Sequence, residues 1–234
     1  MKLADLTWEE VRHYLKTHDA LILPAGMCEQ HGTHLPLGTD TLTAEYVVQR
    51  VAEQTGLAVA PTLNYGVGLP CDREFSGSTT VRPATLRETA RSLATWWTGQ
   101  GFRRILVMSA HGDPFHLRAL GEAHPSMRVL ELYEVELGDI LQRQTGARHA
   151  DEAETSVMLC LFPERVHRDR IQDFETPFHE FRPYLFHERR TPIPGSPGCQ
   201  GYPSAATPEK GRLIVERIIS RALEWTRAVL SAGG

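Results

Sequence analysis

The sequence predicts an α/β fold in which a mostly parallel sheet carries helices on both faces. Short apolar runs alternate with segments whose apolar residues recur at helical spacing. The run 103–110 contains the continuous apolar stretch 105–108, as strands buried inside parallel sheets do. A strand–helix–strand–helix–strand order requires crossover connections, and these place helices on the sheet faces. The 234 residues, 41% of them hydrophobic, are expected to form one domain over 1–234.

The first half of the chain contains two predicted strands and two predicted helices. A short helix is expected over 7–16, a strand over 20–24, a helix over 41–54 and a strand over 57–62. The predicted helix over 41–54 places Ala44, Val47, Val48 and Val51 on one face. A polar segment rich in glycine and proline follows over 64–83 and is expected to be irregular.

The second half continues the alternation and ends in a long helix. Thr85 and Glu88 have capping-box spacing, so a helix is expected to begin there and to end at Gly99 or Gly101. The next predicted elements are a strand over 103–110, a helix over 114–123, a strand over 127–133 and a helix over 151–161.

Residues 163–207 contain no clear element, although this is long for a loop inside a compact domain. A lid, an oligomer contact or an extra pair of strands would each account for it. Thr207 and Pro208 then suit the N-cap and first turn of the last helix. The inner face of that helix is expected to consist of Ile214, Ile218, Ala222, Trp225 and Val229.

The composition excludes several classes of partner. The net charge is −4 and no basic run is present, so neither nucleic acid nor an anionic membrane surface is expected as a partner. No apolar stretch reaches the roughly 18 residues of a membrane span, and the charged N-terminus lacks a signal-peptide core. A cytoplasmic protein is therefore expected.

The cysteines are expected to be free thiols. Cys28, Cys71, Cys160 and Cys199 lie far apart in sequence and form no CxxC pair. Cys28 and Cys71 occur in loops that are expected to lie near the functional site. A packing role is favoured over a nucleophilic one for both, because no pattern marks an activating base.

The segment 24–40 carries the strongest chemical signal. Glu29, His31 and Asp40 are crowded together in a turn after an apolar strand, and His34 is a further possible ligand. Carboxylate oxygens and neutral imidazole nitrogens suit Zn²⁺, Mn²⁺ or Fe²⁺. The segment therefore indicates a divalent-metal site.

Two further segments contain residues of the same kinds. His111 and Asp113 follow the strand 103–110, and residues 148–156 open a helix with His149 and Glu154. Because sites in open parallel sheets form at the carboxyl ends of strands, the fold would gather these segments.

Each of these residues also has a simpler explanation. Asp40 would serve as a helix cap, His111 as a hydrogen-bonded histidine at a strand end, and Glu152 and Glu154 as acids favoured by a helix dipole. The occurrence of Glu, Asp and His in all three segments is what favours a metal site.

These segments together resemble those of a known family. EQHGTHLPLGTD is similar to the signature of creatininase-family amidohydrolases, usually written E-Q-H-G-P-H-L-P followed by T-D. AHGD, HADEAETS, SGSTTV and GYPSAATPEKG resemble further family segments and occur in the family's order. The resemblance extends over 24–211, and the chain is identified as a member.

The resemblance implies a three-layer α/β/α fold, a homohexamer and a hydrolytic centre with two divalent metal ions. By position, Asp40 would bridge the two ions and Glu29 would bind one of them. His31 and His111 would complete the protein ligands of the other ion. Glu154 is expected as the fifth ligand.

Three other positions receive weaker roles from the resemblance. Asp113 is an alternative ligand to Glu154, or a neighbour of the ligands, because creatininase proper has a longer glutamate at this place. The backbone N–H groups of Gly77 and Ser78 would help to hold the substrate.

His149 matches the histidine that is proposed as proton carrier in the family. A dinuclear metal centre would activate a water for attack on an amide-type carbonyl. His149, titrating near neutral pH, would then pass a proton to the leaving nitrogen.

The sequence also departs from the family pattern. Thr33 replaces a proline, Ser109 and Ala110 replace Asn-Gly, and Pro114 stands where an asparagine is common. Creatininase proper covers its substrate with loop tryptophans, whereas this chain has none between Trp97 and Trp225. Creatinine is therefore not expected to be the substrate.

Three functions remain open from the sequence. The first is hydrolysis of a non-peptide C–N bond in a cyclic amide or formamide of a small molecule. The second is a peptidase that trims a peptide-derived cofactor precursor, which a more open groove near 163–207 would favour. The third is a non-catalytic metal-binding scaffold. Within the same segment, Arg182, Phe186, Arg189 and Arg190 are candidates for contact with a neighbouring subunit.

Overall fold

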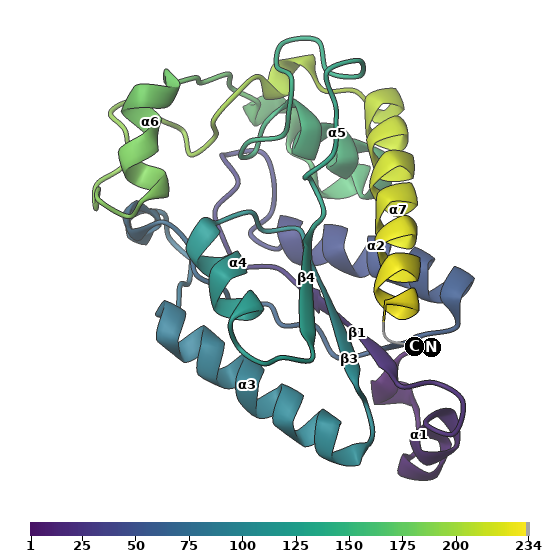
Figure 1. Cartoon of the computed structure of the whole chain (residues 1–234). Coiled ribbons are helices and arrows are strands. Elements are labelled where there is room, and N and C mark those ends of the chain that lie inside the picture. The colour runs from purple at the N-terminus through teal and green to yellow at the C-terminus, as the bar shows by residue number, and fades with distance from the viewer. Residues whose placement is uncertain (233–234) are drawn as a thin grey trace.

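A four-stranded parallel sheet forms the centre of the protein, as predicted. The computed structural model describes residues 1–232 (Figure 1). The strand order is β2-β1-β3-β4. The strands are β1 (Ala20–Ala25), β2 (Ala58–Val59), β3 (Arg104–Ser109) and β4 (Met127–Glu131). β1 and β3 are central, and their last residues, Ala25 and Ser109, are partners in the register. The segments that follow these two strands therefore start side by side.

Helices cover both faces of the sheet and complete the three-layer α/β/α fold. Side chains alternate along β1 and β3, so that Ile22 and Leu106 enter one core while Leu21 and Ile105 enter the other. The first core contains residues of α2 (Thr39–Thr55), α5 (Glu152–Leu161) and α7 (Pro208–Ser231). The second contains residues of α1 (Trp8–Tyr14), α3 (Pro83–Gln100) and α4 (Pro114–Gly121). No helix within residues 1–232 is both long and apolar enough to cross a membrane.

Several helix ends follow the sequence signals. Thr207 caps α7 by accepting a hydrogen bond from the Lys210 N–H, with Pro208 in the first position of the helix. α3 ends at Gly101, whose φ of 117° lies in a region that favours glycine. The expected boundary at Gly101, rather than Gly99, is the correct one.

Two predicted boundaries are wrong. α3 begins at Pro83, so Thr85 lies inside the first turn and cannot act as its cap. Proline fixes a helical φ and needs no hydrogen-bond acceptor at this position, which starts the helix two residues early. β2 is limited to Ala58–Val59 rather than 57–62. It is an edge strand, and Pro61 has no N–H with which to extend the ladder.

The segment 163–207 contains a helix that was not predicted. α6 (Phe178–Leu185) has Pro183 inside it and stands apart from the other labelled helices, at the upper left of Figure 1. A proline inside an eight-residue helix obscures the helical pattern in the sequence. α6 lies on the side of the sheet where the strands end, so it belongs to the surroundings of the site.

Burial of the central strand gives a first prediction. Leu106 on β3 is fully buried, whereas Leu213 on α7 is 41% exposed. Leu106→Ala should lower the free energy of unfolding by about 2–5 kcal/mol, because it removes buried methyl groups and leaves a cavity. Leu213→Ala should change it by less than about 0.5 kcal/mol. Chemical denaturation measures both, and equal losses would contradict the described packing.

Candidate metal centre

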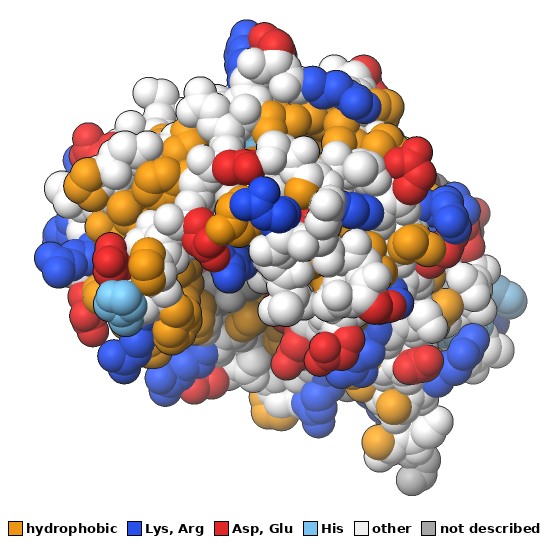
Figure 2. All heavy atoms as spheres, turned by 90° about the horizontal axis from the view of Figure 1, so that it is seen from above, with side chains coloured by type: hydrophobic (Ala, Val, Ile, Leu, Met, Phe, Trp, Pro, Cys, Tyr) orange, Lys and Arg blue, Asp and Glu red, His pale blue; other side chains and the backbone are white. Residues whose placement is uncertain are grey.

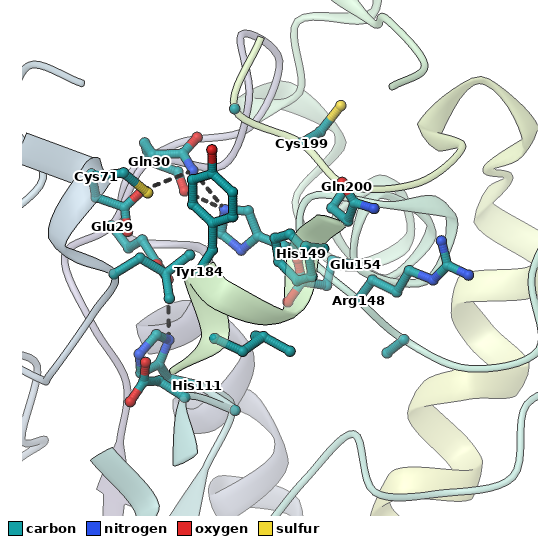
Figure 3. A pocket seen from close by; sticks show the side chains of 18 of the residues that line it. Glu29, Gln30, Cys71, His111, Arg148, His149, Glu154, Tyr184, Cys199 and Gln200 are labelled. Carbon is teal, nitrogen blue, oxygen red and sulfur yellow. Dashed lines mark hydrogen bonds and ion pairs between the residues drawn. The ribbon is translucent and has the colours of Figure 1, made fainter. Parts of the chain in front are cut away.

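Five acidic and imidazole side chains meet at the carboxyl ends of the central strands. Glu29 and His31 lie in the turn after β1, and His111 lies two residues after the end of β3. Asp40 and Glu154 lie in the first turns of α2 and α5. All five residues are buried. Figure 3 shows Glu29, His111, His149 and Glu154 around one cavity.

Asp40 faces two different groups of ligands. Its Oδ1 lies 3.1 Å from His31 Nε2, and its Oδ2 lies 3.2 Å from His111 Nδ1. Glu29 Oε2 is 3.0 Å from the same His111 nitrogen, and Glu154 Oε2 is 3.7 Å from the same His31 nitrogen. Asp40 is thus common to a Glu29–His111 group and a His31–Glu154 group. This differs from the expectation that His31 and His111 would share one ion.

The donor atoms fit a divalent metal. Glu29 Oε2, His31 Nε2 and Asp40 Oδ2 are buried and have no hydrogen-bond partner in residues 1–232, although other polar atoms lie close by. Their contacts at 3.0–3.2 Å lack hydrogen-bond geometry, so the lone pairs of these atoms remain available to a cation. In each group the three potential ligand atoms lie within 4.8 Å of one another. Oxygen and imidazole donors at this spacing are what zinc and manganese use.

When no metal is bound, protons on the imidazoles of His31 and His111 balance the charge of the buried carboxylates. Although burial opposes it, Asp40 and Glu154 raise the pKa of His31 to about 10. Burial also opposes protonation of His111, but Glu29 and Asp40 raise its pKa well above the ordinary value. The same contacts outweigh burial at Glu29, where His111 lowers the pKa to about 2. Both imidazoles are therefore charged at neutral pH when no metal is bound.

His149 lies beside the centre and contacts Gln30. Its Nε2 is 2.8 Å from the Gln30 carbonyl oxygen, and its ring centroid is 4.5 Å from that of His31. Burial lowers the pKa of His149 to about 4, so the imidazole is neutral at pH 7 rather than titrating near neutrality as predicted. One of its nitrogens also lies within 4.8 Å of ligand atoms of Glu29 and His31. This position suits either proton transfer or metal contact.

Two weaker candidates have other partners. Asp113 Oδ1 accepts hydrogen bonds from the Phe115 and His116 N–H groups and so caps α4. Its Oδ2 lies 2.7 Å from His187 Nε2. His34 Nε2 lies 2.8 Å from Thr155 Oγ1. Among the described residues, neither Asp113 nor His34 belongs to a metal-ligand group.

The turn at Gly77 and Ser78 supports Gln30 and does not line the cavity. The Ser78 Oγ accepts a hydrogen bond from the Gln30 N–H at 2.8 Å. The Ser78 N–H donates to the Phe75 carbonyl, so it is already engaged. Neither turn residue is among the described residues that line the cavity. Cys71 does line it, and burial raises the pKa of that thiol to about 12, which favours a packing role.

The cavity contains polar residues that sequence reasoning missed. Burial raises the pKa of Asp72 to about 8, with a further contribution from Glu29, and raises that of Glu131 to about 7. Gln30 lies between Asp72 and His149. Glu131 ends β4, so the rule about strand ends could have identified it. Asp72 lies in the irregular segment 64–83, where the sequence gives no such signal.

Comparison with known proteins identifies the family. A family model described as creatininase, creatinine amidohydrolase, matches residues 4–226. The chain belongs to the creatininase family of amidohydrolases.

Individual relatives agree with this assignment. Creatinine amidohydrolase of Pseudomonas putida is 31% identical, over 92% of this chain and 91% of the relative. The mycofactocin precursor peptide peptidase of Mycobacterium ulcerans is 33% identical, over 90% of this chain and 87% of the relative. A solved structure of creatininase described as its Mn form superposes with a TM-score of 0.81 at 28% identity, covering 97% of both chains. A variant creatininase of Zn–Zn type gives 0.78 at 29% identity and the same coverage.

The shared position of Asp40 gives a second prediction. Asp40→Ala should lose more metal than any other single ligand change, because it removes oxygens from both groups. Elemental analysis of the purified protein measures metal per chain. Asp139→Ala is the matched control, since Asp139 pairs with Arg217 at the surface. Wild-type metal content and activity in Asp40→Ala would contradict the bridging role.

The charged imidazoles give a third prediction. Zinc must displace the protons held by His31 and His111, so binding at pH 7 should release protons. Zinc affinity should rise with pH toward about 10, the pKa of His31, because fewer protons compete. Calorimetry in buffers of different ionisation enthalpy counts the released protons. An observed enthalpy that is the same in every buffer would contradict the prediction.

Proposed function

We propose that the protein hydrolyses a non-peptide C–N bond in a cyclic amide or formamide of a small molecule, with two divalent metal ions in its centre. The observation that carries the proposal is the pair of buried ligand groups that share Asp40. Zinc, manganese and iron all fit this donor set. When bound, such ions polarise the substrate carbonyl and supply a water nucleophile at neutral pH.

The protein's own residues have three tasks in this proposal. Glu29 with His111, and His31 with Glu154, hold the cations, and Asp40 contributes one oxygen to each group. His149 carries the proton to the leaving nitrogen, which its neutral imidazole can do after accepting a proton from the attacking water. Gln30 orients that imidazole through its backbone carbonyl.

A peptidase that trims a cofactor precursor is the second candidate. The 33% identity to the peptidase of Mycobacterium ulcerans supports it. So does the cavity above the centre, whose volume of about 610 Å³ exceeds what a single small ring needs. A non-catalytic scaffold is not favoured, because the chain belongs to a family of amidohydrolases.

A substrate screen separates these functions. Protein loaded with zinc, manganese or iron would be incubated with cyclic amides, formamides and short peptides, and the loss of substrate and formation of the hydrolysed product would be followed by chromatography. Turnover of a cyclic amide or formamide, lost with the metal and restored with it, is expected. Turnover of peptides alone would favour the peptidase. No turnover by fully metal-loaded protein would contradict both.

The proton-carrying role of His149 gives a fourth prediction. His149→Ala should keep its metal but lose kcat by about 10²-fold or more, as expected for a lost acid–base group. His167→Ala is the control, because His167 is exposed and lies outside the cavity. A metal loss as large as that of Asp40→Ala would make His149 a ligand instead.

Assembly gives a fifth prediction. We propose that the chain forms a homohexamer in which the segment around α6 contacts a neighbouring subunit. Phe178 and Phe186 are 69% and 49% exposed there, so this segment presents apolar surface that a neighbouring subunit would cover. Light scattering should give the mass of six chains. The mass of one 26.2 kDa chain, with full activity, would contradict the proposal.

A further inference from the structure

The cavity above the metal centre has a largely apolar wall. Its volume is about 610 Å³, within the range of sites that hold drug-sized molecules. The aromatic residues that line it are Phe75, Tyr133, Phe178, Phe181 and Tyr184. The last three belong to α6, and Leu185 of the same helix also lines the cavity.

α6 presents this wall directly to the centre. Tyr184 points from the helix into the cavity, toward the region of Glu29 and His149 (Figure 3). The Phe181 and Tyr184 rings are nearly parallel, with centroids 6.2 Å apart. Seen from above, hydrophobic side chains gather on the left of the molecule, where α6 lies (Figure 2). A substrate bound at the centre would therefore contact aromatic rings of α6.

A histidine holds α6 in this position. His187 lies two residues after the helix, and its Nε2 is 2.7 Å from Asp113 Oδ2. Its ring packs on Phe115, with centroids 4.3 Å apart. Its φ of 60° is uncommon for a residue other than glycine, so local contacts must maintain it. Because Asp113 also caps α4, the contact between His187 and Asp113 connects the end of α6 to the start of α4.

The charges around the cavity disfavour an anionic substituent. Among the described residues that line it, Arg148 is the one lysine or arginine, and its guanidinium already donates to Glu175 at 2.5 Å. Glu131 and Glu134 line the same cavity. Outside the metal centre, the one cationic side chain of the wall is thus already paired with a carboxylate.

We propose that α6 makes this enzyme selective for amides that carry a neutral apolar substituent, preferably aromatic, and that His187 positions this wall. The proposal rests on the proposed function, because it names the substrate class of the same site. In the reaction, water adds to the carbonyl carbon, the C–N bond breaks and the leaving nitrogen takes a proton. An N-substituted formamide plus water would thus give formate and the amine.

Matched substrates test the selectivity. The metal-loaded full chain would be assayed with N-methylformamide against N-benzylformamide, and with hydantoin against 5-benzylhydantoin. The benzyl member should have at least tenfold higher kcat/KM in the pair that is cleaved, because its ring is buried against α6. 4-(Formamidomethyl)benzoate should lose most of this advantage through its carboxylate. Equal or better turnover of the small member would overturn the proposal.

Variants of α6 test where the selectivity arises. Phe181→Ala combined with Tyr184→Ala should bring the benzyl-to-methyl ratio close to one. Trp96→Ala should leave it unchanged, since Trp96 is 74% exposed on α3 and outside the cavity. Thermal melting and metal analysis would show that each variant is folded and loaded. A ratio that survives the double substitution would overturn the role of α6.

The role of His187 has its own control. His187→Ala should reduce the benzyl-to-methyl ratio without loss of metal. His187→Asn should restore part of it, because asparagine offers an N–H donor to Asp113 and tolerates positive φ. An unchanged ratio in His187→Ala would overturn the positioning role.

Binding measurements separate this proposal from the proposed function. Ligand-observed NMR on metal-loaded protein would report binding of the same pairs even without turnover. Stronger binding of benzyl members with no cleavage would support the wall and contradict amide hydrolysis. Cleavage without any preference would contradict the wall and leave hydrolysis standing. Neither cleavage nor preferential binding would overturn both.

Discussion

Three carboxylates and two imidazoles are buried together at the carboxyl edge of the sheet, and this burial is the main constraint on the surrounding structure. Removing such groups from water costs several kcal/mol each unless opposite charges compensate. Here Asp40 connects His31 to His111, and Glu29 and Glu154 complete the two groups. Asp40 and Glu154 also lie in the first turns of helices, where the helix dipole favours acids. The buried carboxylates of the centre therefore favour the binding of cations.

The surrounding fold keeps these groups close. α7 packs so closely on α5 that a Cβ on Gly211 would lie 1.9 Å from the Ser156 carbonyl oxygen. The neighbouring Lys210 forms an ion pair with Glu152 at 2.5 Å. These contacts fix the first turn of α5, and with it Glu154. The segment G-Y-P-S-A-A-T-P-E-K-G therefore holds Glu154 in position through its packing on α5, although its residues are not among the candidate ligands.

Most of the fold and the main candidate ligands could be predicted from the sequence, because they depend on local patterns. Apolar runs and helical spacing identified β1, β3, β4 and the flanking helices. The grouping of His111 with Glu29 depends on how loops after two strands pack, which sequence spacing does not encode. For the same reason, the hydrogen bond of Asp113 to His187, 74 residues away, was not foreseen. α6 was not predicted because Pro183 interrupts the helical pattern of a short segment. The cavity wall that α6 forms was therefore not predicted either.

Anomalous scattering from crystals of the zinc- or manganese-loaded protein would locate the metal ions of this centre. We expect two metal peaks per chain, one between Glu29 and His111 and the other between His31 and Glu154, with one Asp40 oxygen directed at each. A single peak, or peaks away from Asp40, would contradict this expectation.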